Sequence, residues 1–221
     1  DKTILINTYS LIKISKKLQK NGKLIYMSSS EIYSENPKKI YNEKDIGWTT
    51  PNHVRSSYIE SKRCGEAVIN SLLTKKINAV SLRISLAYGP GVKTSDSRVI
   101  NELIMKALKG DIYLKDSGEA IRTYGYISDI VQMILQIVIS NKSNVYNVAG
   151  SSTLKIKTLA KKIAKILNRK VIINKKKEYL KDAPKRVKVS MKLYEKEFGK
   201  MNLVNINKGL LRTIDWYKSI I

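Results

Sequence analysis

The chain has 221 residues, of which 43% are hydrophobic and 27% are charged. This is the composition of a globular domain, and it excludes collagen-like and disordered classes. No stretch reaches the roughly 18 apolar residues of a membrane span, and we expect no signal peptide. The only cysteine, Cys64, cannot form an internal disulfide, which fits a reducing compartment, and we expect the cytoplasm. Because the chain begins with Asp1 and not Met, we expect a carboxyl-terminal fragment of a longer protein.

The charge is strongly positive, with 42 basic against 18 acidic residues and a formal net charge of +24. One explanation is an anionic partner such as RNA. The other is the composition of an AT-rich genome, because Lys far outnumbers Arg and both Ile and Asn are abundant. The excess is spread along the chain, and the dense runs Lys161-Lys162 and Lys175-Lys176-Lys177 have no interleaved aromatic residues. We therefore favour genome composition, and we expect neither nucleic acid nor a membrane as a partner.

Apolar periodicity and turn residues predict helices that alternate with strands. In chain order, these are a helix over 5–20, a strand over 23–27, a loop over 36–51, a helix over 57–75, a strand over 79–84, helices over 99–109 and 127–140, a strand over 145–148, and helices over 154–168 and 208–221. Strands that alternate with helices are typical of an α/β fold with a parallel sheet.

Tyr58 and Lys62 form the most informative pair. Four residues apart on a predicted helix, they lie on one face, one turn apart. An ammonium group beside a phenol favours the phenolate, and a bound nicotinamide cation acts in the same direction, so Tyr58 is a candidate general base. A Tyr-x-x-x-Lys spacing is common by chance, and alone it identifies no function.

A second polar group, Ser28-Ser29-Ser30-Glu31, follows the predicted strand over 23–27. The carboxyl ends of parallel strands are where open α/β sheets place their sites. A serine cluster after a strand is otherwise only a solvated turn. It indicates a functional site here only in combination with Tyr58 and Lys62.

Together these segments resemble the extended short-chain dehydrogenase/reductase family of NAD-dependent nucleotide-sugar epimerases, dehydratases and decarboxylases. Seven landmarks follow the order of that family: Asn7-Thr8, Ser28 to Tyr33, Arg55 to Arg63, Arg83-Ile84 with Tyr88-Gly89-Pro90, Asp96 to Val99, Arg122 to Asp129, and Tyr146 to Ala149.

The resemblance implies the carboxyl-terminal half of a Rossmann-type doubly wound parallel sheet plus a small α/β substrate-binding lobe. Residues 1–90 would hold the remaining part of the NAD-binding domain with the catalytic Ser, Tyr and Lys. Residues 91–221 would form mainly the lobe for the nucleotide sugar, with segments around 125–148 returning to the Rossmann sheet.

The resemblance also implies residue roles, with NAD as the cofactor. Tyr58 would take the proton of the sugar 4-hydroxyl, Ser29 would hydrogen-bond that oxygen, and Lys62 would hold the nicotinamide ribose. The implied sets are Ser29, Glu31, Tyr58 and Lys62 as catalytic residues, Asn7, Ser28, Tyr58, Lys62 and Arg98 for the cofactor, and Ser30, Arg98 and Arg122 for the substrate, with no metal site.

Ser30 and Glu31 bear on the type of reaction. Dehydratases of the family resemble Thr-Asp-Glu here, and Ser30 cannot replace the Asp that protonates the departing 6-hydroxyl. Ser-Ser-Glu is more similar to the UDP-glucuronate decarboxylases, whose arginine in a later loop aligns with Arg122. The implied function is oxidation of a UDP-linked sugar at C4, followed by decarboxylation or epimerisation, for surface polysaccharide synthesis, in an enzyme that is a homodimer when intact. A 4-epimerase or a 4,6-dehydratase is the alternative.

Several features depart from the family. The glycine-rich NAD-binding half, with its Gly-x-x-Gly-x-x-Gly loop, is absent from this chain, and Leu86 and Leu5 replace a family asparagine and a lysine of some relatives. His53 is expected to be a solvated loop side chain and Cys64 a small buried residue, and one His with one Cys cannot assemble a zinc site. A basic, non-catalytic relative that binds RNA is the alternative from another class. The retained Ser29, Tyr58 and Lys62 argue against it.

Overall fold

The computed structural model describes residues 2–174 and 184–221, so Asp1 and the basic run Lys175-Lys176-Lys177 lie outside the described residues. The chain divides into two compact units. Unit 1 comprises Asp1–Ser85, Gln132–Val148 and Val189–Met201, and unit 2 comprises Leu86–Val131, Ala149–Lys188 and Asn202–Ile221.

Unit 1 is built on a parallel three-stranded sheet in the order β1–β2–β6. The strands are β1 (Leu24–Ser29), β2 (Ala79–Ile84) and β6 (Val145–Val148). The central strand β2 is buried over its first five residues, which is typical of a parallel strand covered on both faces. Its register pairs Leu82 with Met27 of β1 and with Tyr146 of β6. The carboxyl ends of β1 and β2 therefore lie side by side.

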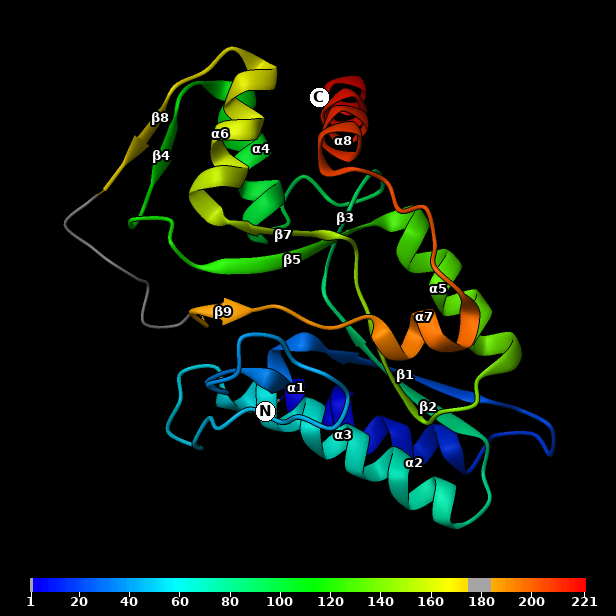
Figure 1. Cartoon of the computed structure of the whole chain (residues 1–221). Helices are drawn as coiled ribbons and strands as arrows, with labels where there is room; N and C mark the ends of the chain where they lie inside the picture. The colour runs from blue at the N-terminus through cyan, green and yellow to red at the C-terminus, as the bar shows by residue number, and fades with distance from the viewer. Residues whose placement is uncertain (1, 175–183) are drawn as a thin grey trace. The chain divides into compact units, whose positions relative to one another are not determined.

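Helices cover both faces of this sheet. Helix α3 (Ser56–Thr74) and the amino-terminal segment α1 (Lys2–Ile4), η1 (Leu5–Tyr9) and α2 (Ser10–Ser15) lie together on one side of β1 and β2, whereas α7 (Lys192–Phe198) lies on the other side, against β6 (Figure 1). The core beneath α3 is apolar and consists of Leu11, Leu24, Tyr26, Ile69, Leu72 and Ala79. Burial of this apolar surface holds α3 against the strands.

The amino-terminal segment differs from the single helix predicted over 5–20. It contains a π-helical turn, η1, in which the backbone N–H of Ser10 donates to the carbonyl oxygen of Leu5. Helix α2 ends at Ser15 because the next bonds tighten to i→i−3 spacing, from Lys17 N to Ile14 O and from Leu18 N to Ser15 O. The segment exposes large apolar side chains, namely Ile4, Leu5, Ile6, Tyr9, Ile12 and Ile14.

Unit 2 is centred on β5 (Ile121–Tyr126). This strand pairs in parallel with β3 (Leu86–Tyr88) and β9 (Arg186–Val187), and antiparallel with β7 (Ser152–Lys155). A separate parallel pair joins β4 (Ile112–Leu114) to β8 (Val171–Ile173). Helices α4 (Val99–Lys109) and α6 (Ile156–Leu167) pack against each other, and α6 also packs against α8 (Ile206–Ile220) (Figure 1). Their shared core includes Ile104, Leu159, Ile163, Leu210 and Ile214.

Several predicted elements match the structure closely. The helices over 99–109 and 127–140 and the strands over 79–84 and 145–148 have the predicted bounds, the second helix being α5 (Ile127–Ser140). The predicted α/β class with a parallel sheet is thereby confirmed. The short strands β3, β4, β5, β7, β8 and β9 and the helix α7 were not predicted.

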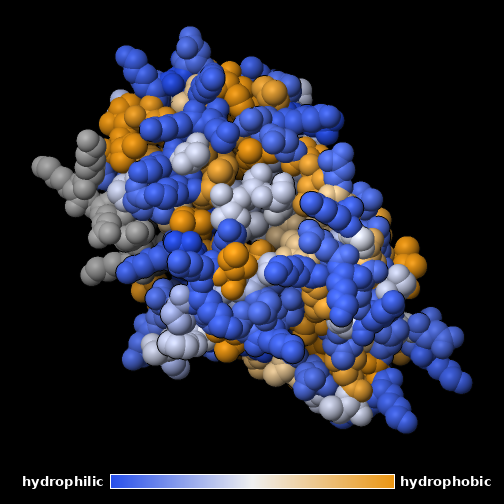
Figure 2. Space-filling model, in the orientation of Figure 1, coloured by the Kyte–Doolittle hydropathy of each residue, from blue (hydrophilic) through white to orange (hydrophobic). Residues whose placement is uncertain are grey.

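No described helix has the length and apolar character needed to cross a bilayer. On the face that Figure 2 shows, hydrophilic residues are spread over the surface with apolar residues between them, and they do not gather into one continuous stripe.

Candidate active site

Tyr58 and Lys62 lie one turn apart on the first half of α3. The Lys62 ammonium nitrogen is 5.9 Å from the centroid of the Tyr58 ring, and it donates a 2.8 Å hydrogen bond to the carbonyl oxygen of Met27 in β1. Nζ also lies 5.1 Å from the centroid of the Tyr26 ring. The helical spacing therefore places the cation beside the phenol and against the strand.

Burial shapes the electrostatics of Lys62. It lowers the pKa of the Lys62 ammonium below its ordinary value, because the charged form loses solvation. An ammonium has three donors, and the Met27 carbonyl accepts one of them. Lys62 can therefore hold the strand and still donate to another group.

Asn7 joins the amino-terminal segment to this part of α3. It lies in the π turn η1, and its Nδ2 donates a 3.0 Å hydrogen bond to Oγ of Ser61, which in turn donates to the backbone carbonyl of Tyr58 at 2.8 Å. The structure thus brings Asn7, Tyr58 and Lys62 together.

The predicted serines lie at the carboxyl end of β1 and are buried. Ser28 Oγ donates a 2.6 Å hydrogen bond to the Glu66 carboxylate of α3. Ser29 caps the short 3₁₀ helix η2 (Ser30–Tyr33), because its Oγ accepts the backbone N–H of Glu31 at 3.1 Å. Ser30 is the first residue of η2. The Ser29 hydroxyl therefore fixes the start of η2, and the Ser28 hydroxyl ties the end of β1 to α3. Residues 28–31 are called the serine turn below.

Glu31 forms a two-bond ion pair with Arg55. The guanidinium donates from Nε at 2.7 Å and from a terminal nitrogen at 2.8 Å to the two carboxylate oxygens. The same guanidinium lies 5.3 Å from the centroid of the Tyr58 ring. Sequence reasoning gave Arg55 no role of its own. The sequence feature that could have indicated its proximity to Tyr58 is the spacing of three residues, which places two side chains on the same face of a helix.

A buried cation, Arg83 of β2, ties the surrounding loops together. It donates twice to the Glu66 carboxylate, to the hydroxyl of Tyr33, and to the backbone carbonyl of Glu43. The Tyr33 hydroxyl donates onward to Asn147 of β6 at 2.8 Å. Arg83 was recognised as part of a landmark, but this network was not predicted. Through Glu66 it reaches Ser28, so it connects the strand ends with the serine turn.

Arg98 and Arg122 belong to unit 2. Arg98 immediately precedes α4, is half exposed and pairs with Asp96 at 2.8 Å, and this guanidinium lowers the pKa of the Asp96 carboxyl to about 2. Arg122 lies on β5, is buried, and donates from Nη1 to the carbonyl of Ile121 at 2.8 Å. Their assignment to phosphate or substrate stays a prediction.

The prediction that Cys64 is buried is wrong. The buried residues of α3, among them Gly65 and Ile69, form a stripe that faces the sheet, whereas Cys64 lies on the exposed side of the helix. His53 lies in the turn between the predicted loop and α3 and is partly exposed, and its Nδ1 accepts the backbone N–H of Arg55 at 3.1 Å. Within residues 2–174 and 184–221, no three His, Cys, Asp or Glu side chains gather as they would around a metal ion.

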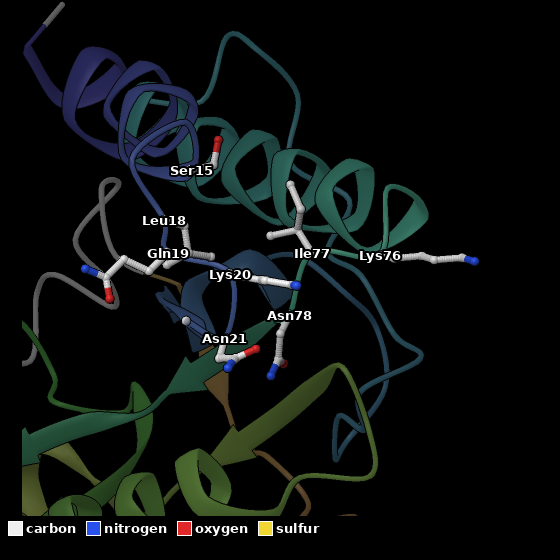
Figure 3. Close-up of a pocket in the computed structure, with 9 residues that line it drawn as sticks. Ser15, Leu18, Gln19, Lys20, Asn21, Lys76, Ile77 and Asn78 are labelled. Atoms are coloured by element: carbon white, nitrogen blue, oxygen red, sulfur yellow. The ribbon is translucent and has the colours of Figure 1, made fainter.

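The structure also contains a pocket of about 380 Å³ in unit 1, away from these residues. It is lined by the segment that follows α2 and by the turn that precedes β2, and it therefore lies at the amino ends of the strands. Lys76 extends away from the other labelled side chains (Figure 3). Because open α/β sheets bind ligands at the opposite, carboxyl ends, this pocket is not the candidate active site.

Comparison with known proteins identifies the family. The family model of the NAD dependent epimerase/dehydratase family matches residues 2–149. UDP-glucuronic acid decarboxylase 1 of Xenopus tropicalis is 26% identical over 219 residues, which cover 98% of this chain and 51% of the relative. The structure of UDP-glucose 4-epimerase from Thermotoga maritima matches with a TM-score of 0.86 at 20% identity, covering 98% of this chain and 71% of that one. The structure of dTDP-glucose 4,6-dehydratase from Bacillus anthracis in complex with NAD matches with a TM-score of 0.80 at 18% identity. The match covers 96% of this chain and 67% of that one.

The chain belongs to the NAD dependent epimerase/dehydratase family. The predicted family and the predicted Rossmann-type fold are thereby confirmed, and NAD is confirmed as the cofactor of this enzyme family. The chain spans about half the length of the Xenopus relative.

Proposed function

We propose that this chain carries the catalytic and substrate-binding portion of an NAD-dependent enzyme that oxidises a nucleotide sugar at C4 and then decarboxylates or epimerises it. The observation that carries the proposal is the arrangement of Tyr58 and Lys62 on one face of α3, with the Lys62 ammonium bonded to β1 just before the serine turn. A base, a cation and hydroxyl donors at the carboxyl end of a parallel strand are the groups that an alcohol oxidation requires.

The residues present fit the nicotinamide ribose of NAD. Lys62 has donors beyond the one that Met27 accepts, and Tyr58 lies beside it on the same helix face, so these two residues would hold the ribose. NAD, when bound, supplies the hydride acceptor for the oxidation at C4. Asn7, Ser28 and Arg98 complete the proposed cofactor-binding set.

Tyr58 is the proposed proton acceptor. Its phenol oxygen would take the proton of the sugar 4-hydroxyl, and the Lys62 ammonium favours the phenolate that this step needs. Ser29 would orient the same sugar oxygen by a hydrogen bond. Its oxygen accepts the backbone N–H of Glu31, so its hydroxyl proton is directed elsewhere and can be donated.

Decarboxylation of a sugar uronate is the reaction that we favour. Ser30 carries no carboxyl group and cannot act as the acid of a dehydratase. Glu31 and Arg122 match the decarboxylase pattern, with Ser30, Arg98 and Arg122 proposed to bind the substrate. The UDP-glucuronic acid decarboxylases among the relatives support this choice. A 4-epimerase is the second candidate, because a UDP-glucose 4-epimerase shares the fold.

The substrate class, the location, the biological role and the oligomeric state are also proposals. We infer a UDP-linked substrate, a cytoplasmic location and a role in surface polysaccharide synthesis. A homodimer is supported by the large apolar side chains that α1, η1 and α2 expose.

The test is the Tyr58→Phe variant in a protein that carries both this chain and a glycine-rich NAD-binding half. The phenylalanine keeps the ring and removes the proton acceptor, so the rate of NADH formation in a single turnover should fall by about 10²–10⁴ with UDP-glucuronate. The control is Tyr113→Phe, since Tyr113 is exposed on β4 in unit 2. UDP-glucose is run in parallel to separate the two candidate reactions. A near wild-type rate for Tyr58→Phe would contradict the proposal.

A further inference from the structure

Arg55 lies between a carboxylate and the candidate base. Both oxygens of Glu31 accept hydrogen bonds from its guanidinium, which leaves the plane of the fork little freedom to rotate. From this position the guanidinium carbon lies 5.3 Å from the centroid of the Tyr58 ring. Arg55 directly precedes Ser56, the first residue of α3, so its backbone is fixed relative to Tyr58 by the helix itself.

We propose that Arg55 is a positioning residue for Tyr58: anchored by Glu31, its guanidinium holds the phenol ring and, together with Lys62, favours the deprotonated phenol. The inference rests on the proposed function, because it takes Tyr58 as the base. It adds a second cation, and the carboxylate that anchors it, to the Tyr58–Lys62 pair.

The groups around Tyr58 come from several elements. On α3 and at its start the ring contacts Lys62 and Arg55. From β1, Tyr26 interacts with Tyr58, and its own pKa is raised far above the ordinary value, chiefly by burial, so Tyr26 is neutral at pH 7. From η1, Asn7 is neutral and reaches the Tyr58 backbone through Ser61.

Two carboxylates of the neighbouring elements are paired with cations. Glu31 of η2 binds Arg55, and Arg83 of β2 binds Glu66. Arg55 and Lys62 both lie over the Tyr58 ring, and cations there favour the phenolate. A guanidinium rather than an ammonium suits this position because its planar fork binds the carboxylate at two points and stacks on a ring.

The test measures the titration of the Tyr58 phenol in the 221-residue chain by NMR, with ¹³Cζ-labelled tyrosine. The signal is assigned by its loss in Tyr58→Phe. The key variant is the double substitution Arg55→Met with Glu31→Gln, which removes the cation and its anchor without leaving a bare carboxylate near the ring. We expect the midpoint of the Tyr58 titration to rise by up to about half a unit, because the double variant removes the cation over the ring together with a carboxylate whose charge acts in the opposite direction.

Arg55→Lys serves as the conservative variant. It keeps the charge and loses the two-point anchor, so the midpoint should rise by less than in the double variant. The control is Lys23→Met, which removes a cation at the amino end of β1, opposite the end that carries the serines, and should leave the midpoint unchanged. Unchanged signals of the other tyrosines verify that the variants are folded.

A wild-type midpoint in the double variant would overturn the inference, and so would an equal rise in Lys23→Met. Neither readout requires cofactor, substrate or turnover. Failure of the proposed function would instead appear as an active Tyr58→Phe enzyme, so the two failures are distinguishable.

Discussion

Gly65 of α3 lies so close to Tyr26 of β1 that a Cβ atom on the glycine would overlap with the tyrosine ring, reaching 2.7 Å from Cε1 and still less from the hydroxyl. This contact sets the distance between the helix that carries Tyr58 and Lys62 and the strand that ends in the serine turn. A side chain at position 65 must push the helix and strand apart.

Gly65→Ala should therefore destabilise the chain, although alanine is the better helix former. We expect a loss of about 1–3 kcal/mol in the free energy of unfolding, which is typical of overpacking in a closely packed interior. Urea denaturation followed by circular dichroism measures it. The control is Gly110→Ala, where the backbone is extended and nothing lies within 4 Å of the added Cβ. Equal stabilities of the two variants would show that Gly65 is not needed for close approach.

The buried pair Arg83–Glu66 should be far more sensitive to truncation than an exposed pair. Arg83→Met leaves the Glu66 carboxylate buried without its cation, and we expect a loss of about 3–5 kcal/mol in the free energy of unfolding. The matched control, Arg98→Met, breaks the half-exposed pair with Asp96 and should cost about 1 kcal/mol or less.

A second variant separates charge burial from packing. Replacing both partners, as Arg83→Met with Glu66→Leu, removes the unpaired charge and should restore part of the stability lost in Arg83→Met. If the double variant is less stable than the single one, the loss arises from packing and from the other hydrogen bonds of Arg83.

The Asp96–Arg98 pair predicts a pH dependence of stability. The folded-state pKa of Asp96 is about 2, below the value of about 3.9 for an unfolded chain. The carboxylate therefore adds stability above pH 4, and that contribution is lost as the pH falls toward 2. Urea midpoints at pH 5 and pH 3 should differ more for the wild type than for Asp96→Asn. The same difference in both proteins would assign the acid sensitivity to other groups. Asp215→Asn, at an exposed position of α8, is the control.

The basic composition predicts weak, non-specific binding to nucleic acid. If genome composition explains the net charge of +24, any binding to RNA or DNA should disappear by about 0.3 M salt and show no preference for sequence. Filter binding with a defined oligonucleotide and a scrambled one measures both properties. Retention of the defined oligonucleotide alone at that salt concentration would favour the RNA-binding alternative.

Elements with a regular apolar stripe were predictable from sequence. Ile100, Ile104 and Ala107 recur at helical spacing and are buried along one side of α4, so its bounds follow from the pattern. Strands β4 and β8 have three residues each, too few for a pattern, and their pairing joins Ile112 to Val171 across most of unit 2. Such pairing depends on the packing of the helices between them.

In the candidate site, some contacts also follow from the local sequence, whereas others depend on the packing of distant elements. Tyr58 and Lys62 are four residues apart in one helix, so their proximity follows from helical geometry alone. The partners of Arg55 and Arg83 lie 24 and 17 residues away, in other elements. No local pattern specifies those contacts, because they arise only when α3 packs against the sheet. The exposure of Cys64 likewise depends on which side of α3 faces the strands.

The π turn at Leu5–Tyr9 has a consequence for comparing this chain with its relatives. A π turn holds one residue more than an α turn, so it acts as a single-residue insertion inside a helix. Against a relative whose helix is α-helical throughout, an ungapped alignment of residues 2–15 will place either Asn7 or Leu11 one position out of register. Asn7 is bonded to Ser61 and Leu11 lies in the core, so both must be matched at once. Alignments of this segment with such a relative should therefore allow a one-residue gap within it.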